Sequence, residues 1–135
     1  MSKPYRLSTG GRFVDRAKKV SFTFDGKTVT GFQGDTVASA VLASGQRVFG
    51  RSFKYHRPRG IFTAGSEEPN ALVELRNGAR QEPNTRATVA ELYEGLSACS
   101  QNYKGSLRYD LLALNDFFSD ILSAGFYYKT FMWPA

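Results

Sequence analysis

Two short runs near the start of the chain alternate apolar and polar residues, as strands with one buried face do. They cover residues 20–24 and 27–32, and an Asp-Gly pair separates them. Asp-Gly is favoured in the two-residue turns that join antiparallel strands. The pattern predicts a β-hairpin in which Phe22 and Phe24, or their neighbours, face the core.

Helical spacing replaces the alternation after the hairpin. Between residues 36 and 44, small apolar side chains recur three and four positions apart. Asp35 stands where a carboxylate can accept the free amides of a first helical turn, and Gly45 stands where a left-handed residue can end the helix. We therefore predict a short helix over residues 36–44, whose small side chains let it lie close to a sheet.

A long connection separates this helix from the next strand patterns. Residues 47–49 are compatible with a brief strand, and an irregular loop continues to about Asn70. Residues 71–75 form an apolar strand pattern, which an Asn-Gly pair turns back towards a β-prone run within residues 85–92. The order strand, strand, helix, loop, strand, strand predicts an α+β domain, in which a small mixed sheet clasps one helix.

The C-terminal part of the chain is apolar and aromatic. Residues 107–122 carry apolar side chains at helical spacing, which predicts a helix. Six of the eleven residues in 125–135 are large apolar or aromatic types. Exposed segments of this kind mark contact surfaces. We therefore expect the chain to belong to something longer or to an assembly; the alternative is a tail that folds back on its own core.

Length, charge and cysteine content narrow the class of protein. The chain has 135 residues, enough for one domain, with or without an appendage, and a net charge of +6 that suits an anionic ligand, an acidic partner surface or nucleic acid. Cys99 is its single cysteine, which excludes an intramolecular disulfide and a thiolate metal site built from this chain alone. No signal peptide or membrane span is apparent, so we expect a soluble cytoplasmic protein.

One window of the long connection is strongly basic. No Asp or Glu occurs between Thr36 and Ser66. The window holds five cations and the only histidine: Arg47, Arg51, Lys54, Arg57, Arg59 and His56. Arginines with loop amides can hold a phosphate or a carboxylate. The alternative is a solvated basic surface or a salt-bridge patch between subunits.

The individual titratable residues do not assemble an active site. A lone histidine such as His56 is more often structural or exposed than catalytic. Glu67 and Glu68 could act as an acid–base pair, but beside Pro69 we interpret them as loop charges. The sequence has no nucleophile elbow, phosphate-binding loop, dinucleotide fingerprint or zinc spacing. We assign no catalytic residue and expect this segment alone not to be catalytic.

The layout of a short helix followed by a long loop resembles plant-type ferredoxin, a β-grasp domain whose [2Fe–2S] cluster sits in that loop. The ligand pattern of that family is Cys-x4-Cys-x2-Cys with a distant fourth cysteine. Aligned on the strand at 71–75, its positions are occupied by Thr63, Glu68, Ala71 and Thr88. None of these is a cysteine, so the chain resembles a ferredoxin-like domain that has lost its cluster.

A closer resemblance covers nearly all of residues 5–134. The segments GDTVASAVLASG, GRSFKYHRPRGIFTAGSEEPNALVEL, EPNTRAT and AGFYYKTFMWP are similar to the N-terminal region of the alpha subunit of heterotetrameric sarcosine oxidase. The resemblance implies an oxidoreductase complex that demethylates sarcosine to glycine, forms hydrogen peroxide and passes the one-carbon unit to tetrahydrofolate. It also implies that related opine and amino-acid dehydrogenases keep a cysteine-containing version of the domain.

The same resemblance implies the cofactors and partners of the parent complex. These are FAD, FMN at the alpha–beta interface, NAD and tetrahydrofolate, with the rest of the alpha subunit and the beta, gamma and delta subunits as partners. The chain ends before a dinucleotide fingerprint would begin, so we expect this segment to bind no cofactor by itself. Arg51, Lys54, Arg57 and Arg59 are candidates for an FMN-phosphate or interface contact.

The expected organisation is an N-terminal arm over residues 1–19, a ferredoxin-like β-grasp domain over 20–98, and a helical and aromatic extension over 99–135 leading to a downstream domain. The alternative function is a small basic module that binds protein or nucleic acid, in which Phe53 and Tyr55 would stack on bases. The modest charge and the absence of an RNA-binding signature argue against nucleic acid. A standalone electron carrier is nearly excluded by the missing cysteines.

Overall fold

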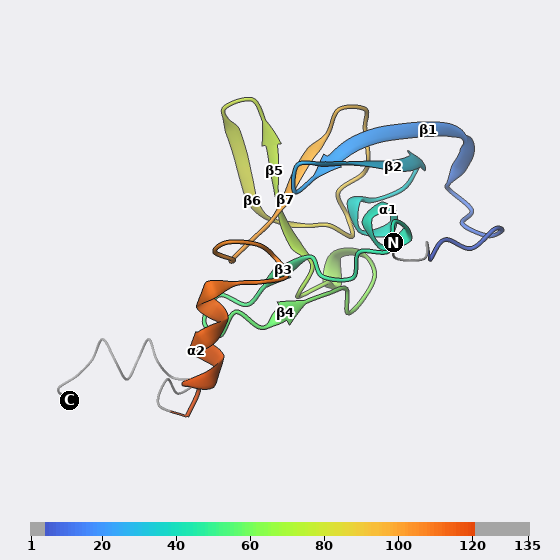
Figure 1. Ribbon diagram of the computed structural model, residues 1–135. Helices are drawn as coiled ribbons and strands as arrows, with labels where there is room; N and C mark the ends of the chain where they lie inside the picture. Colours follow the sequence, from blue (N-terminus) through green and yellow to red (C-terminus); the bar gives the residue numbers. More distant parts are fainter. Residues whose placement is uncertain (1–4, 121–135) are drawn as a thin grey trace.

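The computed structural model describes residues 5–120, and five strands of that region form one mixed sheet. Its spatial order is β2-β1-β7-β5-β6, with β1 and β7 parallel and the other neighbours antiparallel (Figure 1). The strands are β1 (Asp15–Phe24), β2 (Lys27–Gln33), β5 (Leu72–Asn77), β6 (Arg80–Arg86) and β7 (Ser97–Ser100). A mixed sheet with one short helix is the α+β, ferredoxin-like fold that the sequence predicts.

The predicted hairpin is confirmed. Asp25 and Gly26 both have positive φ angles, 50° and 73°, as a two-residue turn between twisted antiparallel strands requires. Phe22 and Phe24 are each 1% exposed and face the core. The first strand begins earlier than the alternation indicates, at Asp15, with an irregularity in its pairing before Lys19.

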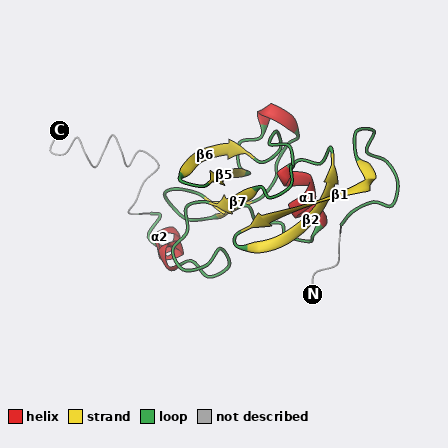
Figure 2. Cartoon of the chain, turned by 90° about the horizontal axis from the view of Figure 1, so that it is seen from above, coloured by secondary structure: helices red, strands yellow, loops and turns green. Residues whose placement is uncertain are grey.

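The predicted helix is α1 (Val37–Ala43), and it packs on one face of the sheet (Figure 2). Its N-cap is Thr36, whose hydroxyl accepts the Ser39 amide at 3.2 Å while the Ser39 hydroxyl accepts the Thr36 amide at 2.9 Å. The prediction that Asp35 caps this helix is wrong. The Asp35 carboxylate is buried and pairs instead with Arg6, which ties residues near the N-terminus to the domain.

The core lies between α1 and the sheet. Gly45, with φ of 97°, follows the C-cap of α1 as expected, so the chain leaves the helix in the left-handed conformation. The largest fully buried apolar side chains are Phe22, Phe24, Phe49, Leu96, Val37, Val41 and Val73. The rings of Phe24 and Phe49 meet edge to face with centroids 5.9 Å apart, which joins the sheet to the long connection.

Two strand predictions are displaced in the structure. The brief strand expected at 47–49 is β3 (Gly50–Arg51), which pairs with β4 (Pro58–Arg59) in a separate two-stranded ribbon. The partner of β5 is β6, which begins before the run predicted at 85–92 and shares only Thr85 and Arg86 with it. Residues 87–89 form a turn instead, and the carbonyls of Ala87 and Ala90 accept amides of the first turn of α1.

Between β4 and β5 lies the short 3-10 helix η1 (Gly65–Glu67).

The helix predicted over residues 107–122 is much shorter where the structure describes it. It consists of η2 (Leu111–Ala113) and α2 (Leu114–Phe117), and α2 lies beside the β3–β4 ribbon (Figure 1). Asp110 ends the preceding loop, because its carboxylate accepts the Leu112 amide at 3.1 Å.

The apolar side chains of η2 and α2 are largely exposed. Leu111, Leu114 and Phe117 are 67%, 68% and 84% exposed, so packing within residues 5–120 does not extend the helix. The end of the predicted helix and the aromatic segment 125–135 lie outside the described residues. No helix among the described residues is long and apolar enough to cross a membrane.

Candidate functional site

The loop that carries the ferredoxin ligand pattern closes around the carboxylate of Glu68. This side chain is fully buried and accepts four backbone amides. Oε2 accepts from Phe62 at 2.8 Å and from Thr63 at 2.6 Å, and Oε1 accepts from Asn70 at 2.7 Å and from Ala71 at 3.0 Å. We call these four backbone groups the amide cage.

The amide cage is held in place by contacts on its outer side. The Arg86 guanidinium donates to the Glu68 carbonyl at 3.2 Å, and the Thr88 hydroxyl donates to the Gly65 carbonyl at 2.6 Å. The Ala87 amide donates to the carbonyl of Ala71 at 2.9 Å. The end of β6 and the turn after it therefore fix η1 and the part of the loop that follows it.

The amide cage stabilises the ionised form of Glu68. Burial by itself raises the pKa of this carboxyl, but the hydrogen bonds from the four amides outweigh burial and lower its pKa below the ordinary value of 4.5. Glu67 is exposed, as a loop charge should be. The interpretation of Glu68 as a loop charge is wrong, because its carboxylate is the buried centre of the loop.

The residues at the pattern positions do not fit an iron–sulfur cluster. Thr63, Ala71 and Thr88 offer no thiolate, and the Thr63 hydroxyl is buried without a hydrogen-bond partner. Cys99 lies in β7 opposite Glu74, and burial raises the pKa of its thiol. Among residues 5–120, no three His, Cys, Asp or Glu side chains gather closely enough to hold a metal ion.

A second buried polar group fixes the basic window. The His56 imidazole and the Asp110 carboxylate are 2.6 Å apart, and the Asp110 carboxylate also accepts the amide of Lys104 at 2.8 Å. The Arg51 guanidinium donates to the carbonyls of His56, Leu107 and Arg108 at 2.7, 2.9 and 3.1 Å. These bonds join the β3–β4 ribbon to the loop that precedes η2. His56 is therefore a structural residue.

The four candidate phosphate contacts take different positions. Arg51 is buried and its guanidinium is occupied by carbonyls. Lys54 and Arg57 each lie over the ring of Tyr55, at 5.0 and 4.7 Å from its centroid. The exposed Arg57 also pairs with Asp116 at 2.7 Å, and Arg59 on β4 donates to the Asn70 side chain at 3.1 Å.

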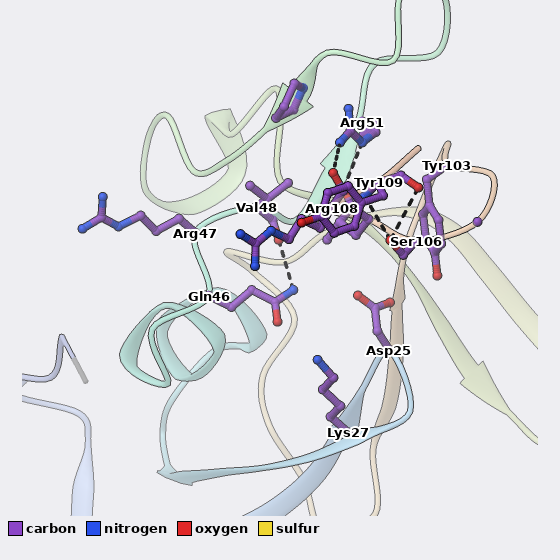
Figure 3. Close-up of a pocket in the computed structure, with 13 residues that line it drawn as sticks. Asp25, Lys27, Gln46, Arg47, Val48, Arg51, Tyr103, Ser106, Arg108 and Tyr109 are labelled. Carbon is purple, nitrogen blue, oxygen red and sulfur yellow. Dashed lines mark hydrogen bonds between the residues drawn. The ribbon is translucent and has the colours of Figure 1, made fainter. Parts of the chain in front are cut away.

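A cleft of about 870 Å3 opens beside the buried Arg51 (Figure 3). Figure 3 shows Asp25 and Lys27, from the β1–β2 turn, on one side, with Arg108 and Tyr109 across from them. The Asp25 carboxylate is engaged by the amide and hydroxyl of Ser100, at 2.7 and 2.8 Å. Sequence reasoning did not identify this cleft, because its residues come from segments far apart in the chain.

Comparison with known proteins assigns the loop to a family. The family described as "2Fe-2S iron-sulfur cluster binding domain" matches residues 17–103, which include the loop around Glu68 and the sheet except for the first two residues of β1. This chain belongs to that family. The ferredoxin ligand pattern, aligned on the strand at 71–75, would place cysteines where this chain has Thr63, Glu68, Ala71 and Thr88.

The relatives that this family member matches are much longer proteins. It is 63% identical over 131 residues to "Sarcosine oxidase subunit alpha" of Rhizobium meliloti (strain 1021), which is 97% of this chain and 13% of that subunit. The protein of the same name from Corynebacterium sp. (strain U-96) is 46% identical over 106 residues, 73% of this chain and 11% of that protein. The resemblance to this subunit in the sequence is thereby confirmed.

A solved structure shares the fold. L-proline dehydrogenase from P. horikoshii superimposes with a TM-score of 0.53 and 26% identity, over 67% of this chain and 17% of that chain. The chain thus spans less than a fifth of each of these three proteins. Two of them are named as sarcosine oxidase subunits and the third as a proline dehydrogenase, so all three names are those of oxidoreductases.

Proposed function

We propose that this chain is a cluster-free structural and interface domain of a sarcosine oxidase alpha subunit. The observation that carries the proposal is the 63% identity to such a subunit over 131 residues. In the proposed parent reaction, sarcosine, oxygen and water give glycine, formaldehyde and hydrogen peroxide. The N-methyl carbon is oxidised, oxygen takes the electron pair, and tetrahydrofolate can accept the one-carbon unit. FAD, FMN and NAD are the further cofactors proposed for the parent complex.

The surface of the domain supports an interface role. Leu111, Leu114 and Phe117 form a run of exposed apolar side chains on η2 and α2, with Tyr109 beside them at 73% exposure. Monomeric proteins rarely expose large apolar patches, whereas subunit and domain interfaces bury them. We propose that this surface contacts the remaining domains of the alpha subunit or its partner subunits.

The basic window of residues 47–59 supports a contact with an anionic group. Lys54, Arg57 and Arg59 lie at or near the surface on the β3–β4 ribbon, while Arg51 holds the ribbon from inside and acts as a positioning residue. An exposed pair such as Arg57–Asp116 is weak in water, so its guanidinium can exchange partners at small cost. We propose that these cations contact the FMN phosphate or an acidic neighbouring surface.

Substrate turnover by the complete protein tests the parent activity. We expect hydrogen peroxide to form with sarcosine and much less with L-proline, measured by a coupled peroxidase assay on the purified complex. Because the solved neighbour is an L-proline dehydrogenase, proline is the informative comparison. Oxidation of L-proline without oxidation of sarcosine would contradict the proposal.

Charge reversal tests the interface role separately. The double variant R57E/R59E in the complete protein should lower flavin content or complex assembly at least severalfold, measured from flavin absorbance per protein and by size-exclusion chromatography. The matched control is K18E/K19E, which reverses two exposed charges on β1. Unchanged flavin content and assembly in R57E/R59E would remove the phosphate and interface roles of this window, whatever the substrate proves to be.

A further inference from the structure

The loop between β4 and β5 is built around one negative charge. Two amides of the cage, those of Phe62 and Thr63, come from the chain before η1, and the other two, those of Asn70 and Ala71, come from the chain after it. Both arms of the loop therefore depend on the same carboxylate for their hydrogen bonds. Without an acceptor at that point, four converging amides would be left unpaired inside the protein.

The acceptor stands at a position of the ligand pattern. Glu68 occupies the second position, and the residues at the first and third positions, Thr63 and Ala71, donate their amides to it. The residue at the fourth position, Thr88, bonds to Gly65 within the same loop. The residues that the sequence spacing marks as ligand positions thus meet in the structure at the loop around the Glu68 carboxylate.

The amide cage can accommodate either a thiolate-held iron–sulfur cluster or a carboxylate, because both are negatively charged. A cluster held by thiolates is negatively charged, and its sulfur atoms accept hydrogen bonds from surrounding groups. Successive inward-pointing amides create a concave site that favours negative charge. A chain that keeps the inward amides and lacks the thiolates needs another anion at the same place.

We propose that the Glu68 carboxylate is a built-in replacement for the iron–sulfur cluster of this family, and that it holds the loop in its closed shape without metal. Glu68 provides the negative charge and the hydrogen-bond acceptors. Because it is a residue of the chain, its carboxylate is attached to the loop covalently, as a cluster would be through thiolates. The loop therefore stays ordered regardless of iron supply and redox state. This inference rests on membership of the cluster-binding family and is independent of the proposed substrate.

Replacing one carboxylate oxygen tests the inference directly. In E68Q the side chain keeps its shape, but one of its two oxygens becomes an NH2 group. Two of the cage amides then face a hydrogen-bond donor and lose their acceptor. We expect the backbone amides of Phe62, Thr63, Asn70 and Ala71 to exchange with deuterium about tenfold to a hundredfold faster than in the wild type. The measurement is hydrogen–deuterium exchange with mass spectrometry on the complete protein.

The neighbouring exposed glutamate provides a matched control. E67Q removes the same charge one position earlier, at a side chain that no cage amide contacts, and should leave the exchange of the loop unchanged. Wild-type protection of all four amides in E68Q would overturn the proposal. An equal loss of protection in E67Q and E68Q would overturn it as well, because the effect would then follow net charge alone.

Restoring the thiolates tests the position of the replacement. The variant T63C/E68C/A71C/T88C, supplied with ferrous iron and sulfide under anaerobic conditions, should bind two irons per chain and acquire the visible absorption of a [2Fe–2S] cluster. The matched control T63C/E68A/A71C/T88C lacks only the ligand at position 68 and should bind much less iron. A folded four-cysteine variant that binds no more iron than this control would overturn the placement; should it not fold, the exchange experiment decides alone.

Discussion

The His56 imidazole and the Asp110 carboxylate lie 2.6 Å apart in the interior, although 54 positions separate them in the chain. His56 has a positive φ of 54°, which is uncommon for a residue other than glycine. The Arg51 guanidinium donates to the carbonyl of this residue at 2.7 Å. The basic window is therefore joined to the interior by a buried Arg–His–Asp group, and Arg57 and Arg59 lie exposed on its outer side.

Removing the charge of Asp110 should destabilise the domain strongly. In D110N one oxygen is lost as an acceptor, so His56 or the backbone amides of Lys104 and Leu112 lose a partner inside the protein. We expect the free energy of unfolding of the chain to fall by about 2–4 kcal/mol. Urea denaturation followed by circular dichroism measures this change.

The half-exposed Asp116 is the matched control for Asp110. Its pairing with Arg57 is open to water, so D116N should leave the free energy of unfolding close to that of the wild type. Equal effects of D110N and D116N would show that burial of the His–Asp contact does not matter for stability.

Acid should weaken the fold through the two buried carboxylates. The pKa of Glu68 and that of Asp110 are both lowered in the folded chain: burial opposes this shift, but backbone amides, and for Asp110 also His56, outweigh it. A carboxyl with a lowered folded pKa contributes its full stabilisation above its unfolded pKa. That stabilisation is lost as the pH falls through the interval between the unfolded and folded values.

The contribution of these two carboxylates to the free energy of unfolding should therefore be nearly constant above about pH 5 and should fall below the ordinary carboxyl values of 4.5 and 3.8. E68Q should be less stable at neutral pH and should show a shallower fall in acid. Urea midpoints measured across this range test the slope. A fall in E68Q as steep as in the wild type would mean that Glu68 is not one of the groups that titrate.

Among the turn glycines of the hairpin region, Gly34 should lose the most stability when it is replaced by alanine. It has φ of 86°, and an added Cβ would lie 1.9 Å from the carbonyl oxygen of Phe13. G34A should cost more than about 3 kcal/mol, because both the backbone conformation and the contact with the N-terminal segment are disturbed. G26A is the control: its φ is 73° with open space around it, so only the conformational cost of about 1 kcal/mol applies. Similar thermal unfolding midpoints for both variants would contradict this reasoning.

The contact between Arg6 and Asp35 should anchor the segment that precedes β1. The guanidinium forms two hydrogen bonds with the carboxylate, at 2.6 and 3.2 Å, and Asp35 is 1% exposed. R6A should make cleavage by trypsin within residues 5–19 several times faster, because the segment loses its ion pair with the buried Asp35. R12A removes an exposed arginine that stacks on Phe13 and should change the rate of cleavage at the other sites little. Unchanged cleavage in R6A would show that other contacts hold this segment.

The hairpin and the helix could be predicted because their signals are local. An Asp-Gly turn between alternating runs and a left-handed glycine after a helix depend on a few adjacent residues. β6 lacks such a signal: it is polar throughout and contains Pro83, which an edge strand tolerates. β7 is only four residues long, and its apolar character is weak.

The candidate site was missed for a different reason. Glu68, beside another glutamate and a proline, has the composition of a surface turn, and its burial depends on amides from both ends of a long loop. Its coincidence with a position of the ligand pattern was the one available signal. The pairing of His56 with Asp110 likewise requires the three-dimensional fold, since no local pattern connects the two.

The absorption spectrum of the native particle that carries this sequence tests the central claim most directly, read together with the mass of the particle. The account predicts a large yellow complex with the bands of bound flavin and no iron–sulfur absorption. A colourless particle near 15.0 kDa would contradict the assignment to a flavin-containing oxidase. A brown particle with two irons per copy of this chain would contradict the replacement of the cluster by Glu68.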